Sequence, residues 1–201
     1  MRKGIGICCV FLGIACLLIA VGFVFHNSRE EKNGETMSQV LLQNVQANIY
    51  EAEKAETVLQ EDVQEPDHRQ MPTIPAGEYE SIGILSIPVL ELELPVLTDW
   101  SYTKLKKAPC HYYGSYYGTD FVIAAHNYAS HFGRLSQLQA GDLVLFTDVT
   151  GQTHCYEVVL LETLAPTATE EMITSGFDMS LYTCTPGGGN RVTVRCNKVN
   201  N

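Results

Sequence analysis

Three hydrophobic patterns follow one another along the chain. The first is an uncharged apolar run over residues 5–25, the second is a polar stretch with a weak helical stripe, and the third is a series of short β-type runs. As a helix, an apolar run of this length spans about 30 Å, which matches the hydrocarbon core of a bilayer. We therefore predict that residues 1–25 form a cytoplasmic tip and a transmembrane anchor.

A cleaved signal peptide is the alternative interpretation of the first run. The run is long for the apolar part of a signal peptide, and no clear small-residue cleavage pattern follows Phe25, so the sequence favours a retained anchor. Arg2 and Lys3 precede the run, whereas mixed charges follow it. The positive-inside rule then predicts a cytoplasmic N-terminus and an extracellular remainder.

Residues 26–79 are predicted to form an acidic, partly helical stalk and a linker. Apolar residues recur at three- and four-residue steps between Thr36 and Val63, which predicts a helix, and Thr36 with Gln39 fits a capping box. A poorly ordered polar stalk is the alternative. The apolar stripe consists of Leu41, Val45, Ile49, Ala52, Leu59 and Val63. The prolines that predict an extended linker are Pro66, Pro72 and Pro75.

Residues 80–201 have the pattern of a β domain, because runs rich in β-branched and aromatic residues alternate with turn residues. The predicted strands are 82–87, 92–97, 121–125, 143–147, 153–164, 179–184 and 191–197. Residues 131–138 are predicted to form a short helix. The aromatic stretch 111–118 is predicted to be a loop that either lines a groove or packs on the domain. Strands at this spacing favour a closed barrel, which leaves few edges unpaired.

Composition and charge narrow the classes of function. The 201 residues carry a formal net charge of −10, and residues 26–80 hold twelve acidic against four basic residues, so most of the excess lies in the stalk. No basic stripe with interleaved aromatics is present, so we expect no nucleic-acid partner. Four cysteines lie in the β domain, where the sequence permits either free thiols or a disulfide, Cys110–Cys155 or Cys155–Cys196.

The candidate chemistry lies in residues 180–195, where a β-rich run ends at Cys184, a Pro-Gly loop follows, and Arg191 opens the next run. If the runs pair, the loop brings a guanidinium beside the thiol, where it favours the thiolate and can hold an oxyanion. His126 ends the apolar run FVIAAHN and can exchange a proton with the thiol. A cysteine, a histidine and an arginine at strand ends predict cysteine acyl-transfer chemistry. The alternative is a buried thiol, a core histidine and a solvated arginine.

Arg195 is the main rival to Arg191, because it lies four residues further along the same strand and shares its face. We prefer Arg191 because it is nearest to the loop. The other histidines of the domain do not have the spacing of a metal motif with His126, and the acidic residues of the domain are dispersed. We therefore predict no metal and no cofactor. The histidines weighed for such a site are His111, His131 and His154.

These motifs resemble the signature of the sortase family, in which a TLxTC strand is followed by a loop and an arginine, with a separate histidine motif like AAHN at 124–127. Ser180 stands where the family prefers Thr, and Ala125 where many members have Gly. The resemblance covers residues from about 80 to the C-terminus. It implies an all-β fold, a closed eight-stranded sortase-type β-barrel with short helices, after a transmembrane helix and a stalk. The single anchor suggests a class B- or D-like member.

The resemblance also implies a membrane-anchored transpeptidase. Cys184 would cleave an LPxTG-like C-terminal sorting signal of a secreted protein, and an amine of a cell-wall precursor or a pilin would resolve the thioacyl-enzyme. His126 would transfer protons and Arg191 would stabilise the oxyanion. Thr183 and Asn127 are the candidate substrate-binding residues, and Asn127 can also orient His126. A thiol hydrolase with the same three residues and a non-catalytic surface-binding barrel remain alternatives.

Overall fold

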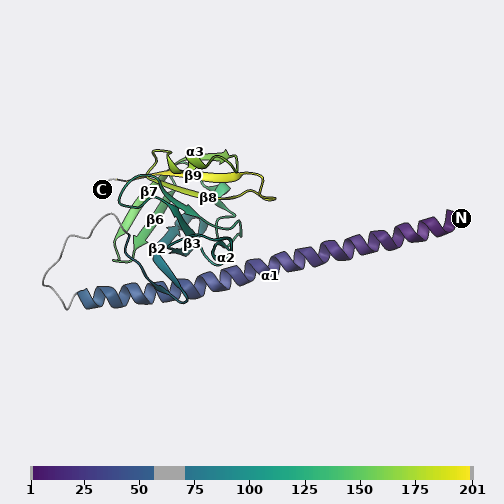
Figure 1. Cartoon of the computed structure of the whole chain (residues 1–201), viewed down its shortest axis with the longest axis horizontal. Coiled ribbons are helices and arrows are strands. Elements are labelled where there is room, and N and C mark those ends of the chain that lie inside the picture. The colour runs from purple at the N-terminus through teal and green to yellow at the C-terminus, as the bar shows by residue number, and fades with distance from the viewer. Residues whose placement is uncertain (1, 57–70, 200–201) are drawn as a thin grey trace.

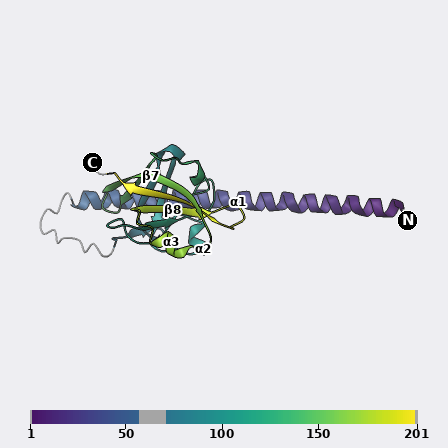
Figure 2. The same ribbon diagram turned by 90° about the horizontal axis from the view of Figure 1, so that it is seen from above.

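The computed structural model describes residues 2–56 and 71–199. One long helix, α1 (Arg2–Glu56), runs along one side of a β domain, and its N-terminal part projects well beyond that domain (Figures 1 and 2). The helix predicted over 36–63 therefore begins much earlier. The capping box at Thr36 is wrong, because this residue lies inside a continuous helix and its hydroxyl donates to the Lys32 carbonyl. Leu59 and Val63 lie outside the described residues.

The β domain follows the strand pattern closely. Its strands are β1 (Ile74–Ala76), β2 (Tyr79–Ile87), β3 (Leu92–Leu97), β4 (Cys110–Tyr113), β5 (Phe121–Ala124), β6 (Leu143–Asp148), β7 (Thr153–Leu164), β8 (Met179–Cys184) and β9 (Arg191–Lys198). Its short helices are η1 (Pro88–Leu90), α2 (Tyr102–Leu105), η2 (Leu135–Gln137) and α3 (Thr169–Ile173). The strands β1 and β4 arise where a linker and a loop were expected.

Eight of these strands close into a barrel. The hydrogen-bonded order runs β2-β3-β4-β5-β8-β9-β7-β6, and β6 pairs back onto β2, while the short β1 pairs with β2 as an added strand. The closed eight-stranded β-barrel is thereby confirmed. Most pairs are antiparallel, but β3 runs parallel to β4 and β5 runs parallel to β8, so β5 and β8 end at the same edge of the barrel.

The barrel interior is filled by aliphatic and aromatic side chains. Tyr116 is fully buried and its ring lies against Phe121 and Phe146, with centroids 5.8 and 5.2 Å apart. The aromatic stretch 111–118 therefore packs into the domain, at least through Tyr116. The helix predicted over 131–138 is wrong except for η2, because the chain after His126 folds back on itself in tight turns.

The C-terminal half of α1 packs on the barrel. Leu41, Val45 and Ile49 of the predicted stripe are buried in a cluster with residues of β1, β2 and β3. Burying three aliphatic side chains contributes about 5–9 kcal/mol before entropic costs. This part of α1 is therefore an ordered part of the folded domain, which the alternative of a poorly ordered stalk did not anticipate.

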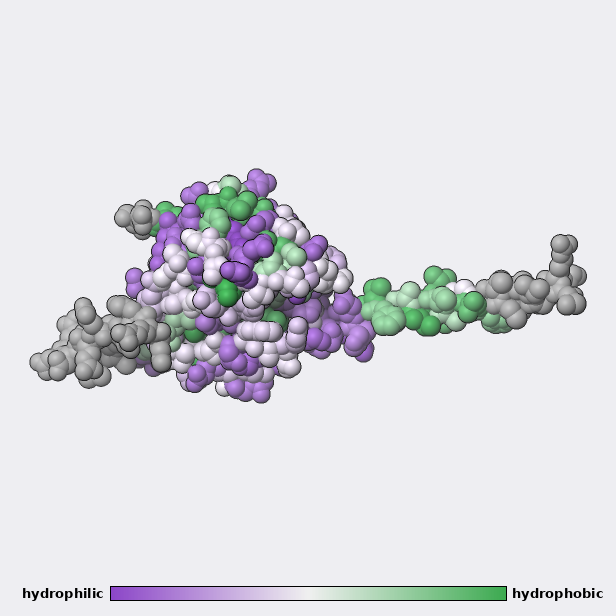
Figure 3. Space-filling view, turned by 45° about the horizontal axis from the view of Figure 1, so that its top comes forward, coloured by the Kyte–Doolittle hydropathy of each residue, from purple (hydrophilic) through white to green (hydrophobic). Residues whose placement is uncertain are grey.

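The N-terminal part of α1 has the opposite environment. Its side chains from residue 11 to residue 25 are apolar and exposed, and in Figure 3 they form a hydrophobic rod that leaves the barrel at a hydrophilic stretch. Among the described residues, one helical segment, Phe11–Ala52, contains a window apolar enough to cross a bilayer. An exposed apolar rod of this length is costly in water, which favours a lipid environment.

Candidate active site

The strands β8 and β9 bring Cys184 and Arg191 together. They pair antiparallel, and Cys184 is the direct cross-strand partner of Arg191. The connecting loop is closed by a hydrogen bond from the Thr185 amide to the Asn190 carbonyl, 2.9 Å long. Gly187 has a φ of +83° in this loop, which a glycine adopts without strain. The sequence of this loop thus folds the arginine back beside the strand-end thiol.

The parallel pairing of β5 with β8 brings His126 to the same edge. Ala124 is the partner of Tyr182, and the Ala125 amide donates to the Tyr182 carbonyl at 3.2 Å. His126, two residues beyond the end of β5, and Cys184, the last residue of β8, therefore lie at equivalent positions along two adjacent chain segments. The three candidate catalytic residues, far apart in the sequence, come from neighbouring strand ends at one edge of the barrel.

Thr183, one of the two candidate substrate-binding residues, is buried beside these strand ends. Its side chain is 3% exposed, and its hydroxyl donates to the Ala125 carbonyl at 2.9 Å. This bond ties β8 to the chain segment that carries His126. The geometry therefore assigns Thr183 to holding the two strand ends together.

The imidazole of His126 is half-buried against Tyr128. The two rings are stacked with centroids 4.0 Å apart and an interplanar angle of 25°. Burial lowers the pKa of His126, and the nearby Lys106 ammonium lowers it further, whereas Glu30 and Asn127 act in the opposite direction. The atom Nδ1 is buried and has no hydrogen-bond partner among the described residues. This environment favours the neutral imidazole.

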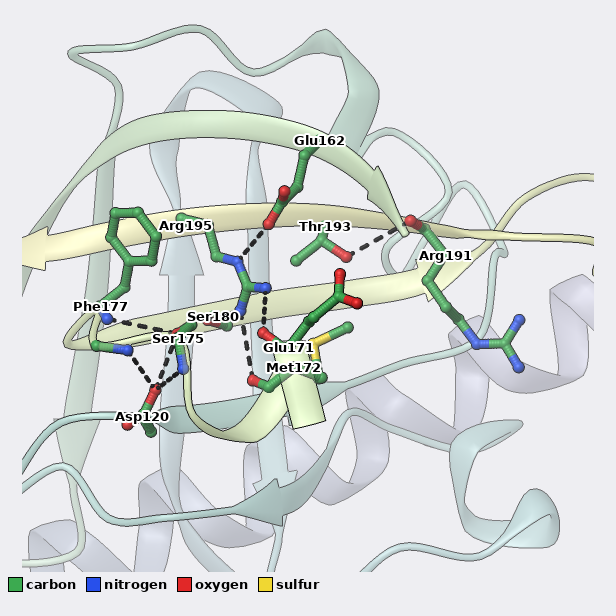
Figure 4. Close-up of polar contacts among 11 residues, drawn as sticks. Asp120, Glu162, Glu171, Met172, Ser175, Phe177, Ser180, Arg191, Thr193 and Arg195 are labelled. Carbon is green, nitrogen blue, oxygen red and sulfur yellow. Dashed lines mark hydrogen bonds and ion pairs between the residues drawn. The ribbon is translucent and has the colours of Figure 1, made fainter. Parts of the chain in front are cut away.

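Arg191 is held at the loop. Its Nη1 donates to the Gly188 and Asn190 carbonyls at 3.3 and 3.2 Å. A guanidinium has five N–H donors, so these two contacts fix its position while further donors can serve a bound anion. In Figure 4 its guanidinium points away from the cluster around Arg195.

The rival arginine is engaged elsewhere. Arg195 is 2% exposed and its Nε donates to Glu162 Oε1 at 2.7 Å, while its Nη1 donates to Ser180 Oγ at 2.8 Å. It also donates to the carbonyls of Glu171 and Met172, at 2.7 and 3.3 Å (Figure 4). Arg195 therefore binds the backbone of α3 to the barrel instead of facing Cys184.

Asp120 is a second anchor for the β7–β8 connection, which includes α3. Its Oδ1 accepts hydrogen bonds from the amide and hydroxyl of Ser175, at 2.7 and 2.8 Å, and from the Gly176 amide at 2.9 Å (Figure 4). Sequence reasoning weighed Arg195 only as a rival catalytic arginine and did not single out Asp120, because each anchor joins segments that are distant in the chain. One sequence feature could have pointed to Asp120. It follows a Gly-Thr pair and stands directly before an apolar run that predicts a buried strand.

The other thiols of the barrel differ from Cys184. In the part of the chain that the structure describes, Cys110, Cys155, Cys184 and Cys196 are all free, so neither proposed disulfide is formed. Burial raises the pKa of Cys110 and of Cys196 to about 12. These two thiols stay protonated at neutral pH and are poor nucleophiles, whereas Cys184 is only half-buried.

The other three histidines of the barrel have structural surroundings. His111 Nδ1 and Nε2 lie 3.2 and 2.8 Å from the carbonyls of Thr98 and Gly114. His154 Nε2 lies 3.0 Å from Asp148 Oδ2. His131 is fully buried, and burial lowers its pKa to about 4. His126 is therefore the histidine that shares an edge with Cys184.

Comparisons with known proteins agree with this fold. Residues 85–199, just over half of the chain, match the sortase domain family. No curated protein sequence gives a significant match. The solved structure of sortase C1 from Streptococcus suis is 32% identical, with a TM-score of 0.54, over 60% of this chain and 74% of that one.

Two further solved structures share the architecture at lower identity. Sortase C from Streptococcus pneumoniae is 22% identical, with a TM-score of 0.56, over 82% of this chain and 96% of that one. A sortase D5 transpeptidase from Clostridium perfringens is 17% identical, with a TM-score of 0.59, over 82% of this chain and 99% of that one. At these identities the likeness concerns the fold.

Proposed function

The chain belongs to the sortase family of cysteine transpeptidases, and we propose that it transfers secreted proteins from an LPxTG-like C-terminal sorting signal to an amine at the cell surface. The observation that carries the proposal is the register of three strands. Cys184 faces Arg191 across β8 and β9, and His126 follows the strand parallel to β8. Thiol, guanidinium and imidazole are the groups that acyl transfer through a thioester needs.

In the first step, the Cys184 thiol gives its proton to the neutral His126 imidazole, and the resulting Sγ thiolate attacks the carbonyl carbon of the scissile peptide bond. Arg191 stabilises the resulting oxyanion, since a guanidinium near developing negative charge lowers the barrier. As the intermediate collapses, the carbon–nitrogen bond breaks and His126 donates a proton to the leaving amine. The products are a thioester on Cys184 and the released tail of the sorting signal.

In the second step, an amine attacks the thioester carbonyl. His126, now neutral, accepts a proton from the incoming amine, and the Cys184 thiolate leaves as the new amide bond forms. The low pKa expected from burial of His126 suits this role, because a largely neutral imidazole can accept a proton near neutral pH. Water attacking in place of the amine would make the enzyme a hydrolase.

We assign the N-terminal part of α1 to the membrane, with the barrel outside the cell. The loop between β8 and β9 lies on the side of the barrel toward which this part of the helix projects (Figures 1 and 2). From Phe25 to Glu30 the helix rises by about 7–8 Å, so the candidate site would lie close to the bilayer surface. Substrates held in the same membrane would then reach it at a raised effective concentration.

The acceptor is proposed to be an amine of a cell-wall precursor or of a pilin subunit. The sortase C of Streptococcus pneumoniae has pilin substrate specificity, and this supports a pilin acceptor for the present chain only by analogy. The assignment to a class B- or D-like member stays a prediction. Asn127 remains a proposed contact to substrate or to His126.

A peptide-joining assay tests the proposal. The full chain in detergent is given an LPxTG-like peptide with and without an oligoglycine or lysine acceptor, and the products are identified by mass spectrometry. We expect a new amide with the acceptor, and no product from Cys184→Ala, His126→Ala or Arg191→Ala, with Cys155→Ala as the matched active control. If the peptide is only hydrolysed even when an acceptor amine is present, the result would favour the thiol hydrolase instead.

A further inference from the structure

The part of α1 just beyond the apolar run contacts the loop that follows His126. Glu31 Oε1 accepts a hydrogen bond from the Ala129 amide at 2.8 Å. One residue earlier, Glu30 Oε1 lies 3.0 Å from Lys106 Nζ, beside the end of α2. Two consecutive carboxylates of the helix thus hold two segments of the barrel that border the imidazole.

Gly34 lets α1 approach this loop closely. A Cβ atom at this position would lie 2.7 Å from the Lys106 carbonyl oxygen and 2.9 Å from Cε2 of Tyr128, both too close for real contacts. A glycine inside a helix costs about 1 kcal/mol relative to alanine. Here the missing side chain is what allows the helix backbone to lie against the Tyr128 ring.

Tyr128 connects the helix with the imidazole. Its ring lies against α1 at Gly34 and is also stacked on His126 at a centroid distance of 4.0 Å. The loop backbone is folded around this stack, because the Phe132 amide donates to the His126 carbonyl at 3.2 Å and the Gly133 amide to the Tyr128 carbonyl at 2.8 Å. The Tyr128 ring therefore has little freedom to move unless α1 or the loop moves with it.

We infer that Glu31 and Gly34 of α1 are positioning residues for catalysis, which hold Tyr128 against His126 and so fix the imidazole relative to Cys184. The inference rests on the proposed function and extends it, because it makes the membrane-proximal turn of the anchor helix a part of the catalytic machinery. A misplacement of about 1 Å at a proton-transfer group can cost up to a hundredfold in rate.

The first test compares two glycine-to-alanine variants of the full chain in detergent. Gly34→Ala inserts the clashing Cβ, whereas Gly22→Ala is the matched control, since a Cβ there meets nothing within 4 Å. We expect Gly34→Ala to lower kcat about tenfold or more with less than a twofold change in KM, and Gly22→Ala to leave both unchanged. A kcat within twofold of the parent for Gly34→Ala, with its fold intact, would overturn the inference.

The second test avoids any packing clash. Glu31→Ala removes the acceptor of the Ala129 amide at an exposed position, while Glu31→Gln keeps an acceptor oxygen and serves as the conservative rescue. We expect a roughly fivefold loss of kcat in the first variant and a rate close to the parent in the second, at unchanged melting temperature. Equal rates for all three proteins would count against the inference even if Gly34→Ala failed to fold.

The third readout follows His126 directly and does not depend on turnover. Loosening the stack on Tyr128 admits water, so NMR titration of the His126 ring should show a higher pKa in Gly34→Ala than in Gly22→Ala. The charged and titratable groups that act on or lie against the ring are Glu30, Lys106, Tyr128 and His131, while Cys184 and Arg191 lie at the same edge of the barrel. An unchanged pKa would refute the positioning role. If the parent protein joined no peptides, the proposed function would fail, while this titration would still decide the inference.

Discussion

Replacing Arg195 by methionine should loosen the β7–β8 connection without touching the candidate catalytic residues. The guanidinium is buried and donates to one carboxylate, one hydroxyl and two backbone carbonyls. Methionine keeps much of the volume but none of the donors. The carbonyls of Glu171 and Met172 would lose the contact that holds α3 to the barrel.

The expected loss of stability depends on how well water can replace Arg195 at each group that it binds. Removing one member of a buried ion pair costs about 3–5 kcal/mol. The Glu162 side chain is 31% exposed, so water can solvate its carboxylate again, and Glu171 of α3 is exposed, although Met172 is buried. Both facts place the expected loss at the lower end, about 3 kcal/mol. For a domain of this size, that loss corresponds to a fall in Tm of roughly 10 °C.

The assay is urea unfolding followed by the fluorescence of Trp100, the single tryptophan of the chain. Glu157→Gln is the matched control, because Glu157 is an exposed carboxylate of the same strand and its replacement should change the stability by less than about 0.5 kcal/mol. We also expect KM for the sorting peptide to rise about tenfold in Arg195→Met, since a loosened connection must be ordered on binding. A loss of stability below 1 kcal/mol would refute the reasoning.

Two further predictions concern titratable groups. Native protein at pH 8 should be alkylated by iodoacetamide at Cys184 before Cys110 or Cys196, as peptide mapping can show, and equal labelling of all three would contradict the assigned burial. Because burial lowers the pKa of His131 to about 4, its contribution to stability is complete above about pH 6.5 and is lost as the pH falls toward 4, by roughly 3 kcal/mol in total. Urea unfolding across this range should show a flatter pH slope for His131→Gln, and an equally steep slope would contradict the assignment.

Much of the barrel could be predicted from the sequence, because its strands have continuous β-type patterns with clear turn residues. The strand β1 was missed because Pro75 looks like part of a linker, although proline is tolerated in a short added strand. The strand β4 was missed because glycines interrupt the aromatic sequence 111–118 in which it lies, and this pattern predicts a loop. The continuity of α1 was missed because Thr36 resembles a helix start, so the helix predicted in the membrane anchor and the helix predicted from Thr36 were treated as separate.

The candidate site was predictable to the extent that it depends on strand ends. Pairing of two neighbouring runs was enough to bring Cys184 and Arg191 together. The contacts that support His126 were not predictable, because they join distant parts of the chain; Glu31 and Ala129, for example, are 98 residues apart. Such contacts depend on how α1 lies on the barrel, and no local pattern encodes that arrangement.

The central claim is that the half-buried thiol of Cys184 forms a thioester with a sorting signal. The direct measurement is intact-protein and peptide mass spectrometry of the full chain after brief incubation with an LPxTG-like peptide and no added amine. We expect an acyl adduct on Cys184 that disappears when an amine acceptor is added. No adduct with any sorting peptide, or an adduct on Cys155 that persists in Cys184→Ala, would contradict it.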